Sequence, residues 1–266
     1  YVGDNTFAGN ITINSNKVVF NTSTGKVTFT GINNQTLNGS YNYPFKKLAI
    51  NKTAGTVTAN TTLSVDDSLI FILGNLITTS TNLLTMKNGS IATGASNSSF
   101  VSGPVKKIGT SAFEFPVGKS NIYQSLSISA PSTASDAFTC EYFNYGQNIS
   151  SSIDTSIDIL DNCDFWSLSR NAGGTNVNIT LSWQGSDCKF TDSTDIRVAG
   201  HNGTKWINYG QQSYIGNSSQ GKVTNNSSIT NFNYFTLGLD ISRPDYLPAL
   251  GICVVPTGSS EICLPA

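Results

Sequence analysis

Short apolar runs separated by polar turns make up the first hundred residues of the chain. In Lys26–Gly31 polar and apolar positions alternate, as they do in a strand with one buried face. Strands this short are not stable as ordinary hairpins, but coils stacked on one another bury the inward side chains of each coil. We therefore predict a short parallel β-solenoid over residues 1–108. Its other expected strands are Leu48–Asn51, Thr56–Asn60, Leu63–Val65, Leu69–Asn75 and Leu83–Met86.

A loose internal repeat supports this prediction. Residues 63–79 and 83–99 both run from an apolar strand through Asn-Leu-Ile or Gly-Ser-Ile into a Thr/Ser/Gly turn. Self-similarity at a fixed period is the mark of a solenoid. The alternative for this part is a β-sandwich with irregular strands.

The pattern changes after Phe113, where the strands lengthen. In Val177–Trp183 every second residue is apolar, which is typical of a half-buried antiparallel strand. We predict an antiparallel β-sandwich over residues 109–242, with Trp166, Trp183 and Trp206 in its core or at its rim, so the whole chain is expected to be all-β. The expected strands are Tyr123–Ala130, Ala137–Tyr145, Asp164–Arg170, Asn176–Trp183, Asp195–Gly200, Lys205–Tyr209 and Tyr234–Leu239.

Residues 243–266 differ from both parts. Arg243–Pro248 resembles a linker, and Ile252–Val255 is a short apolar run. This tail is expected to be a linker, or a strand that completes the sheet of a neighbouring copy.

Composition narrows the function classes. Only 12% of the 266 residues are charged, the net charge is −1, and His201 is the sole histidine. Acid–base and nucleophilic catalysis draw on groups that are scarce here, so we expect no enzymatic activity. The lysines and arginines form no basic stripe, which argues against nucleic acid as a partner. The longest apolar run, Leu69–Leu73, is too short to span a bilayer, and because no signal peptide opens the chain we expect a mature product or a fragment.

Five cysteines suggest an oxidising compartment. Of the possible arrangements we favour two disulfides, Cys253–Cys263 and Cys163–Cys188, which leave Cys140 unpaired. The alternative is five reduced, buried thiols. No CxxC pair or cluster of histidine with cysteine supports zinc.

Fourteen Asn-x-Ser/Thr sequons occur, where chance predicts roughly 7. Either N-glycosylation or clustered low-complexity sequence explains this excess equally well. The asparagines concerned are Asn10, Asn21, Asn34, Asn38, Asn51, Asn60, Asn88, Asn97, Asn148, Asn178, Asn202, Asn217, Asn225 and Asn226.

Other polar residues could form sites or have ordinary roles. Asp154, Asp158, Asp161 and Asp164, with Asp187, Asp192 and Asp195 later in the chain, have the oxygen ligands that Ca²⁺ prefers, although solvated loop carboxylates are the favoured reading and no other cofactor is expected. Asp66 and Asp67 invite comparison with polysaccharide lyases, but neighbours in a strand face opposite sides. His201 is expected to be a turn residue. An aromatic sugar-binding platform and core packing are the two readings of Tyr41, Tyr43, Tyr142, Tyr145, Tyr209 and Tyr214.

The most specific string is Gly103–Lys107 followed by Phe113–Gly118, which reads GPVKK and then FEFPVG. Together with Phe165–Arg170, Val177–Trp183, Asp195–Ala199 and Phe235–Gly238, it resembles a module of very large surface proteins of Bacteroidota, including gliding-motility adhesins and other cargo of the type IX secretion system. The resemblance covers roughly residues 27–239 and implies a solenoid leading through this junction into a sandwich.

At the junction we expect Val105 and Phe113–Val117 to cap the solenoid, Pro116 to end strand pairing and Gly118 to reverse the chain. The resemblance also implies O-linked glycosylation, for which Ser68 and Ser193 fit the sequence pattern.

The sequence thus predicts a structural or adhesive module of a secreted cell-surface protein that acts as a stiff spacer or adhesin segment. Its expected partners are other copies, neighbouring modules or surface glycans. One alternative is a filament subunit joined by strand exchange through Val18–Phe20 or Ile252–Val255. A weaker alternative is a protein that binds or degrades polysaccharides.

Overall fold

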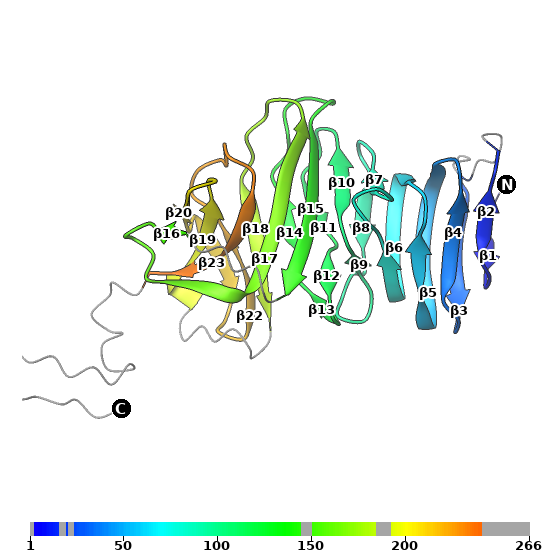
Figure 1. The fold of residues 1–266 in the computed structure, drawn as a ribbon, viewed down its shortest axis with the longest axis horizontal. Helices are drawn as coiled ribbons and strands as arrows, with labels where there is room; N and C mark the ends of the chain where they lie inside the picture. The colour runs from blue at the N-terminus through cyan, green and yellow to red at the C-terminus, as the bar shows by residue number, and fades with distance from the viewer. Residues whose placement is uncertain (1–2, 16–19, 21–23, 145–150, 185–192, 241–266) are drawn as a thin grey trace, which may run out of the picture.

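The protein is a rod built almost entirely of β-strands (Figure 1). The computed structural model describes residues 3–15, 20, 24–144, 151–184 and 193–240, and no α-helix occurs among them. A parallel β-solenoid of about five turns is followed by antiparallel sheets, which confirms the predicted fold class. No helix in the described part of the chain is long and apolar enough to cross a membrane.

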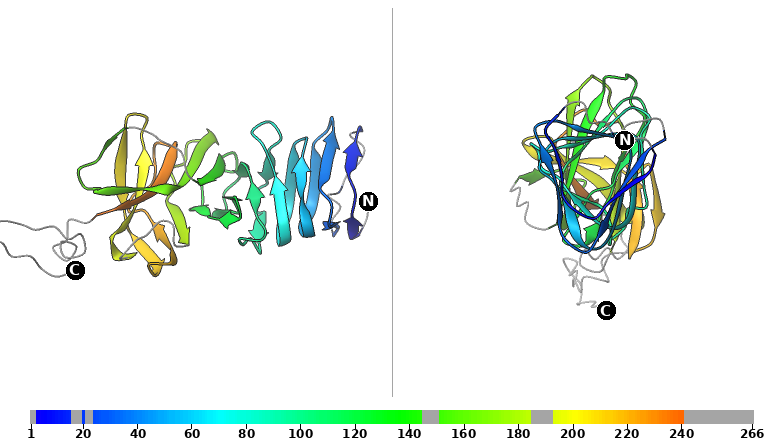
Figure 2. Two further views of the ribbon diagram at one scale, coloured as in Figure 1. Left: turned by 60° about the horizontal axis from the view of Figure 1, so that its bottom comes forward. Right: turned by 90° about the vertical axis from the view of Figure 1, so that its right-hand side faces the viewer.

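Three columns of parallel strands form the solenoid, and the strands lie across the long axis of the rod (Figures 1 and 2). Val27 pairs with Leu48 and Leu48 with Leu69, while Leu63 pairs with Leu84 and Leu84 with Val105, so these stacked residues are 21 positions apart. The strands are β1 (Asn5–Phe7), β2 (Ile11–Ile13), β3 (Lys26–Gly31), β4 (Gln35–Gly39), β5 (Tyr43–Ala59), β6 (Leu63–Ile77), β7 (Leu84–Met86), β8 (Ile91–Thr93), β9 (Val101–Ser102) and β10 (Val105–Ile108).

Alternation along each strand puts one set of side chains inside. Val27 and Phe29 of β3 are buried, whereas Lys26 and Thr28, which alternate with them along the strand, are half-exposed. Because equivalent residues stack directly on those of the next turn, the interior is a column of aliphatic and aromatic side chains. The short apolar runs of the sequence thus become long strands that bend around corners.

Side chains from one turn satisfy the backbone of the next at these corners. Asn34 Oδ1 accepts a hydrogen bond from the backbone N–H of Thr56 at 3.0 Å, and Asn88 Oδ1 accepts one from Thr110 at the same distance. Glycine is required where corners approach closely: Gly39 has φ +132, and a Cβ there would lie 1.9 Å from the carbonyl oxygen of Ile13.

Strand β10 joins the two regions. On one side it pairs in parallel with β7, and on the other it pairs antiparallel with β15 (Ala137–Asn144), from Val105 with Cys140 to Ile108 with Ala137. One 16-stranded sheet therefore runs through the molecule. The predicted change from solenoid to sandwich falls at this strand.

The junction motif seals the interior beside β10. Phe115 of β11 (Phe113–Phe115) and Val117 are fully buried, and the carbonyl oxygen of Pro116 accepts a hydrogen bond from the N–H of Val101. The prediction that Gly118 reverses the chain is wrong. Ser120 and Asn121, with φ 51 and 63, make the reversal between β12 (Gly118–Lys119) and β13 (Ile122–Tyr123), because these left-handed dihedrals form the tight turn. Glycine is needed at position 118 for another reason. A Cβ there would lie 2.8 Å from the Phe100 ring, so only glycine lets the backbone pass this close to the ring.

Two antiparallel sheets face each other beyond the junction. The first continues the long sheet through β15, β17 (Ile159–Ala172), β23 (Tyr234–Leu239), β19 (Ile196–His201), β20 (Lys205–Gly210) and β16 (Ser152–Ile153). The second, here called the outer sheet, runs in the order β11, β14 (Leu126–Ile128), β18 (Ile179–Gln184), β22 (Gln220–Thr224) and β21 (Ser213–Gly216). A short 3₁₀ helix, η1 (Ser193–Asp195), precedes β19.

One large hydrophobic cluster extends through both regions, and a smaller one around Trp206 lies in the sandwich. The large cluster extends from Ile13 in the solenoid to Leu239 in the sandwich, and Phe115, Phe138 and Trp166 belong to it near the junction. Trp166 and Trp206 are core residues, as expected, and Trp183 is 3% exposed. Residues 243–266 lie outside the described residues, so the tail stays a prediction.

Candidate functional site

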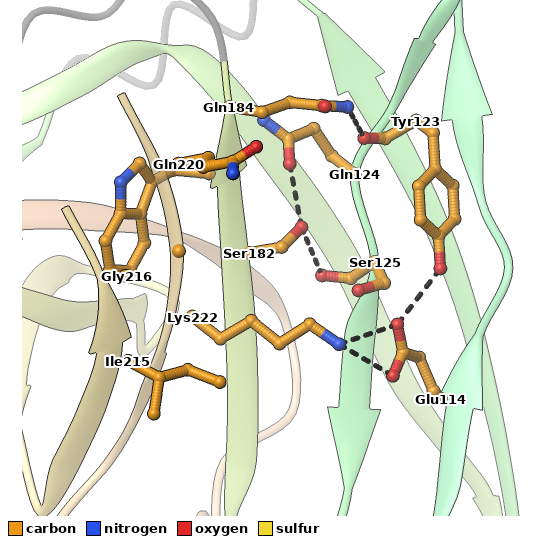
Figure 3. A pocket seen from close by; sticks show the side chains of 12 residues that line it. Glu114, Tyr123, Gln124, Ser125, Ser182, Gln184, Ile215, Gly216, Gln220 and Lys222 are labelled. Carbon is orange, nitrogen blue, oxygen red and sulfur yellow. Dashed lines mark hydrogen bonds and ion pairs between the residues drawn. The ribbon is translucent and has the colours of Figure 1, made fainter. Parts of the chain in front are cut away.

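A groove of about 330 Å³ crosses the solvent-facing side of the outer sheet and is lined by an ion pair, a phenol, carboxamides and hydroxyl groups (Figure 3). Its residues come from the strands β11, β18, β21 and β22 and from Tyr123–Ser125. Strands rather than long loops hold most of these side chains, so their positions are fixed by backbone pairing.

An ion pair lies across the groove. Lys222 Nζ, from β22, donates to Glu114 Oε1 at 2.9 Å and to Oε2 at 2.8 Å, although β11 and β22 are separated in the sheet by β14 and β18 (Figure 3). Lys222 spans that distance because the residues between them are the small Ser125 and Ser182. The phenol of Tyr123 donates to Glu114 Oε1 at 3.0 Å.

These contacts fix the protonation states. Burial favours a raised pKa for Glu114, but hydrogen bonds from Lys222 and Ser125 outweigh it and hold the pKa below its ordinary value. Burial, with the negative charge of Glu114 beside it, raises the pKa of Tyr123 far above its ordinary value. Glu114 is therefore an ionised acceptor and Tyr123 a neutral donor at physiological pH, and neither is poised to exchange a proton during catalysis.

A buried chain of hydrogen bonds supports the floor. Ser182 Oγ donates to Gln124 Oε1 at 2.7 Å, and Gln124 Nε2 donates to Asp164 Oδ2 at 3.2 Å. The phenol of Tyr142 donates to Asp164 Oδ1. The floor is thus anchored to β15 and β17 of the opposite sheet.

Glycine shapes one end of the groove. A Cβ on Gly221 would lie 2.2 Å from the indole ring of Trp183, so only glycine allows this ring to lie against β22. Trp183 Nε1 donates to the carbonyl oxygen of Asn217 at 2.9 Å, which fixes the ring. Gln184 Nε2 donates to Asn97 Oδ1 at 2.7 Å and to the carbonyl oxygen of Tyr123, and so links the groove to the solenoid.

Sequence reasoning missed this groove. Glu114 lies in the junction motif, but Lys222 is 108 residues away. Strands β21 and β22 were not predicted, because Ser213–Thr224 lacks a clear alternation of apolar residues. The only signal was a charged residue between two phenylalanines in Phe113–Phe115.

His201 does have a hydroxyl beside it, which its sequence neighbours did not reveal. Ser151 Oγ lies 2.9 Å from His201 Nε2, while the backbone N–H of Gly203 donates to Nδ1 at 3.2 Å. Because Nδ1 accepts this bond in the neutral ring, Nε2 carries the proton and donates to Ser151. A catalytic base has the opposite arrangement, with Nε2 accepting from the nucleophile. The pair is therefore structural.

The described aspartates that could supply calcium ligands do not gather into a metal site. Among the described residues, no three His, Cys, Asp or Glu side chains are placed to hold a metal ion. Asp154 instead accepts hydrogen bonds from Ser156 and pairs with Lys205 at 3.7 Å, and Asp158 is exposed. Asp161 and Asp164 are buried, while Asp187 and Asp192 lie outside the described residues.

Asp66 and Asp67 are neighbouring, half-buried residues of β6. Asp67 lies 3.8 Å from Lys47 of the preceding turn in an exposed ion pair. Of the six tyrosines, Tyr43 and Tyr142 pack in the core, at 0% and 1% exposure, because their rings face inward. Tyr41 and Tyr214 are exposed, Tyr209 is half-buried, and Tyr145 lies outside the described residues.

The cysteines agree with the sequence analysis as far as they are described. Cys140 is free and buried, and Cys163 is disulfide-bonded. Cys188, Cys253 and Cys263 lie outside the described residues, so both disulfide pairings stay predictions.

The sequon asparagines mostly have structural roles. Asn10, Asn34, Asn88 and Asn97 accept backbone hydrogen bonds from the next turn, and Asn38 and Asn60 bond to each other across turns at 2.8 Å. Asn202 and Asn217 cap their own turns, whereas Asn178 bonds to the side chain of Gln212. Asn51 lies half-buried in β5, and Asn226 is exposed. Asn21 and Asn148 lie outside the described residues.

Two candidate glycosylation sites are closed in the folded protein. Asn225 is 0% exposed, and its Oδ1 accepts from the N–H of Ile179 at 2.6 Å, which leaves no room for a glycan. Ser68 is 8% exposed within β6. Those two predictions are therefore wrong for the folded chain. Ser193 lies half-exposed in η1.

No family model, curated protein or solved structure matches this chain.

Proposed function

We propose that this protein is a non-enzymatic structural or adhesive module of a secreted cell-surface protein, which acts as a stiff extracellular spacer or adhesin segment. The observation that carries the proposal is the shared strand β10, which belongs at once to the last turn of the solenoid and to the first sheet of the sandwich.

Stiffness follows from this sharing. Bending at the junction would separate β10 from β15 and expose Val105, Phe115 and Phe138, all of which are at most 1% exposed. Each such side chain contributes about 1.5–3 kcal/mol when fully buried. A flexible linker would have allowed bending at almost no cost, so this junction favours a rod over two hinged domains.

The extracellular setting is supported by the chemistry of Cys163. Disulfides persist in oxidising surroundings, and Cys163 is disulfide-bonded. The GPVKK and FEFPVG strings that resemble the Bacteroidota surface module are the residues that build the junction.

A non-enzymatic role is supported by the two polar sites. The ionised Glu114 is already held by Lys222 and Tyr123, and His201 presents a proton, not a lone pair, to Ser151. A general base needs a free lone pair near its target.

Small-angle X-ray scattering of the purified chain, with a polysaccharide turnover assay on the same sample, tests this proposal. We expect the scattering of a single rod and no turnover. A bent or two-lobed distance distribution would contradict the spacer. Turnover that is lost in Asp66→Asn or Asp67→Asn would replace it with an enzyme.

A filament subunit is the second candidate, favoured by the position of the sheet edges. Strands β1 and β16 end the 16-stranded sheet, and they lie at opposite ends of the rod (Figure 1). End-to-end contact of copies would continue the sheet. Phe20 is not available for exchange, since its ring is 3% exposed and stacks on Phe45 at 5.4 Å; Val18 and Val19 lie outside the described residues. Electron microscopy of purified protein tests this candidate: regular fibres support it, and single rods at high concentration contradict it.

A further inference from the structure

We propose that the groove between Tyr123, Lys222 and Ile215 binds an uncharged saccharide chain. This inference rests on the proposed adhesive function, because it names the class of ligand that the adhesin segment holds.

The charges in the groove favour an uncharged ligand. Lys222 Nζ contacts both oxygens of Glu114, so each charge already has its partner. An anionic ligand would have to take Lys222 from Glu114 and leave the carboxylate without its cation, and a cationic ligand would do the reverse. Either exchange would break the two short charge-assisted hydrogen bonds between Lys222 and Glu114. A neutral ligand binds without breaking the pair.

Hydrogen-bonding groups around the groove match a polyhydroxylated ligand. Gln220 is exposed at the rim, and its carboxamide offers a donor and an acceptor, whereas both N–H groups of the half-buried Gln184 are taken by Asn97 and Tyr123. Figure 3 shows Ser125 and Ser182 between them and the ion pair. Sugar hydroxyls also donate and accept, and the two oxygens of a carboxylate such as Glu114 accept from adjacent hydroxyls.

An apolar surface completes the site. Ile215 is 68% exposed although it is a large aliphatic residue in a strand, and it pairs in register with Lys222. The Trp183 ring also lines the groove. Sugar rings carry C–H groups on their faces, which pack on such side chains. The volume of about 330 Å³ falls within the range of small-ligand sites, and the groove opens to solvent, so a chain can pass through it.

Tyr214 provides a matched control. It neighbours Ile215 on β21 and is also exposed, at 39%, but it points to the other face of the strand and does not line the groove. Both residues are on the surface, so Ile215→Ser and Tyr214→Ser are expected to fold equally well.

Affinity electrophoresis through gels that contain soluble β-glucan, mannan, galactan or polygalacturonate tests the inference. We expect at least one neutral polymer to retard the native protein, Ile215→Ser to weaken that retardation about tenfold, as loss of one apolar contact in a binding site does, and Tyr214→Ser to leave it unchanged. Retardation by polygalacturonate alone, equal loss in both variants, or no retardation by any neutral polymer would overturn the inference.

Scattering from the same preparations separates this inference from the proposed function. If the protein scatters as a rod but no neutral polymer retards it, the saccharide site fails and the spacer stands. If a neutral polymer retards a bent or two-lobed protein, the spacer fails.

Discussion

The solenoid and the sandwich bury charges of opposite sign. Lys52 and Lys107 are each 1% exposed and belong to the solenoid, whereas the sandwich buries Asp136, Asp161 and Asp164. Lys52 and Lys107 are surrounded by backbone carbonyl oxygens, whereas Asp136 is surrounded by backbone N–H groups.

Carbonyl groups converge inside the solenoid corners. Lys107 Nζ donates to the carbonyl oxygens of Lys87 and Ser90, both at 2.7 Å. Lys52 Nζ donates to the carbonyl oxygen of Thr30 at 3.0 Å and to Gln35 Oε1 at 2.6 Å, and Gln35 in turn donates to the carbonyl oxygens of Phe7 and Gly9. A buried acceptor needs a donor, and a long ammonium side chain reaches two turns.

Backbone N–H groups converge in the sandwich loops. Asp136 accepts from the N–H of Thr133 at 2.9 Å and from that of Thr175 at 3.3 Å. Burial alone would raise the pKa of Asp136, but these bonds and that of the Thr175 hydroxyl outweigh it and lower the pKa to about 2. For Lys52, Lys107 and Asp136, the sign of the buried charge therefore matches the backbone groups that surround it.

The largest expected loss of stability comes from a substitution in the hydrophobic core that the solenoid and the sandwich share. Phe115→Ala removes a fully buried ring at the junction and should cost about 3–5 kcal/mol. Because one large cluster extends through both regions, hydrogen exchange should accelerate in the solenoid and the sandwich together. Ile32→Ala, at a side chain 67% exposed, is the control and should change stability by less than about 0.5 kcal/mol. Acceleration confined to the sandwich would show two separate cores.

Next in size is the loss of a buried donor from the solenoid. Lys107→Met keeps the length of the side chain but leaves the carbonyl oxygens of Lys87 and Ser90 without Nζ, at a cost of about 2–3 kcal/mol. Lys106→Met, on the next residue, removes an equal charge from a half-exposed position and should be nearly neutral. Denaturant titration of both variants measures the difference, and equal midpoints would contradict the role of Lys107.

Asn225 tests whether a sequon asparagine is structural. Asn225→Ala removes the acceptor of the Ile179 N–H and should cost about 1–2 kcal/mol, whereas Asn226→Ala, in the overlapping sequon, should cost much less because Asn226 is exposed. Thermal denaturation of unglycosylated protein provides the comparison. A larger loss in Asn226→Ala would refute it.

The smallest effect is a pH dependence that belongs to the sandwich. Burial, followed for Asp161 by repulsion from Asp164, raises the pKa of Asp161 to about 7, and burial raises that of Asp164 to about 6. Carboxyl groups with a raised pKa keep protons in the folded state that the unfolded chain releases. These two groups therefore lower the free energy of unfolding as the pH rises from about 4 to 7. Asp161→Asn should flatten this slope, so that its stability relative to the native protein increases from pH 4 to pH 8.

Lys107, in the solenoid, should give stability the opposite dependence on pH, in a higher pH range. Burial lowers its pKa to about 8, so the folded state releases a proton that the unfolded chain keeps, and stability should rise between about pH 8 and 10. Unfolding titrations from pH 5 to 10 separate the two regions. A monotonic profile in the native protein would contradict this assignment of the buried charges.

The sequence predicted the strands well where packing is periodic. Lys26–Gly31 and Tyr234–Leu239 coincide with β3 and β23, because alternating burial leaves a trace in the residues themselves. It predicted corners less well. The sequence carries no signal that Lys52 and Lys107 are buried, since their acceptors are mainly backbone oxygens that no side-chain pattern shows.

The groove and the sequons also depend on contacts between distant residues, which the sequence pattern does not show. Glu114 and Lys222 meet only because three neighbouring strand pairings, β11 with β14, β14 with β18 and β18 with β22, bring them to one face. The sequon excess suggested glycans, yet Asn34 and Asn88 hold the next turn, a role set by stacking across 22 residues.

The distance between spin labels on the two regions tests the shared strand most directly. Labels placed through unnatural amino acids at Thr53, exposed on the solenoid, and Ser213, exposed on β21, leave the cysteines untouched. Pulsed electron paramagnetic resonance should give one narrow distance distribution, unchanged when the solution is made viscous. A broad or two-peaked distribution would mean that the junction bends and that β10 does not join the two regions into one rod.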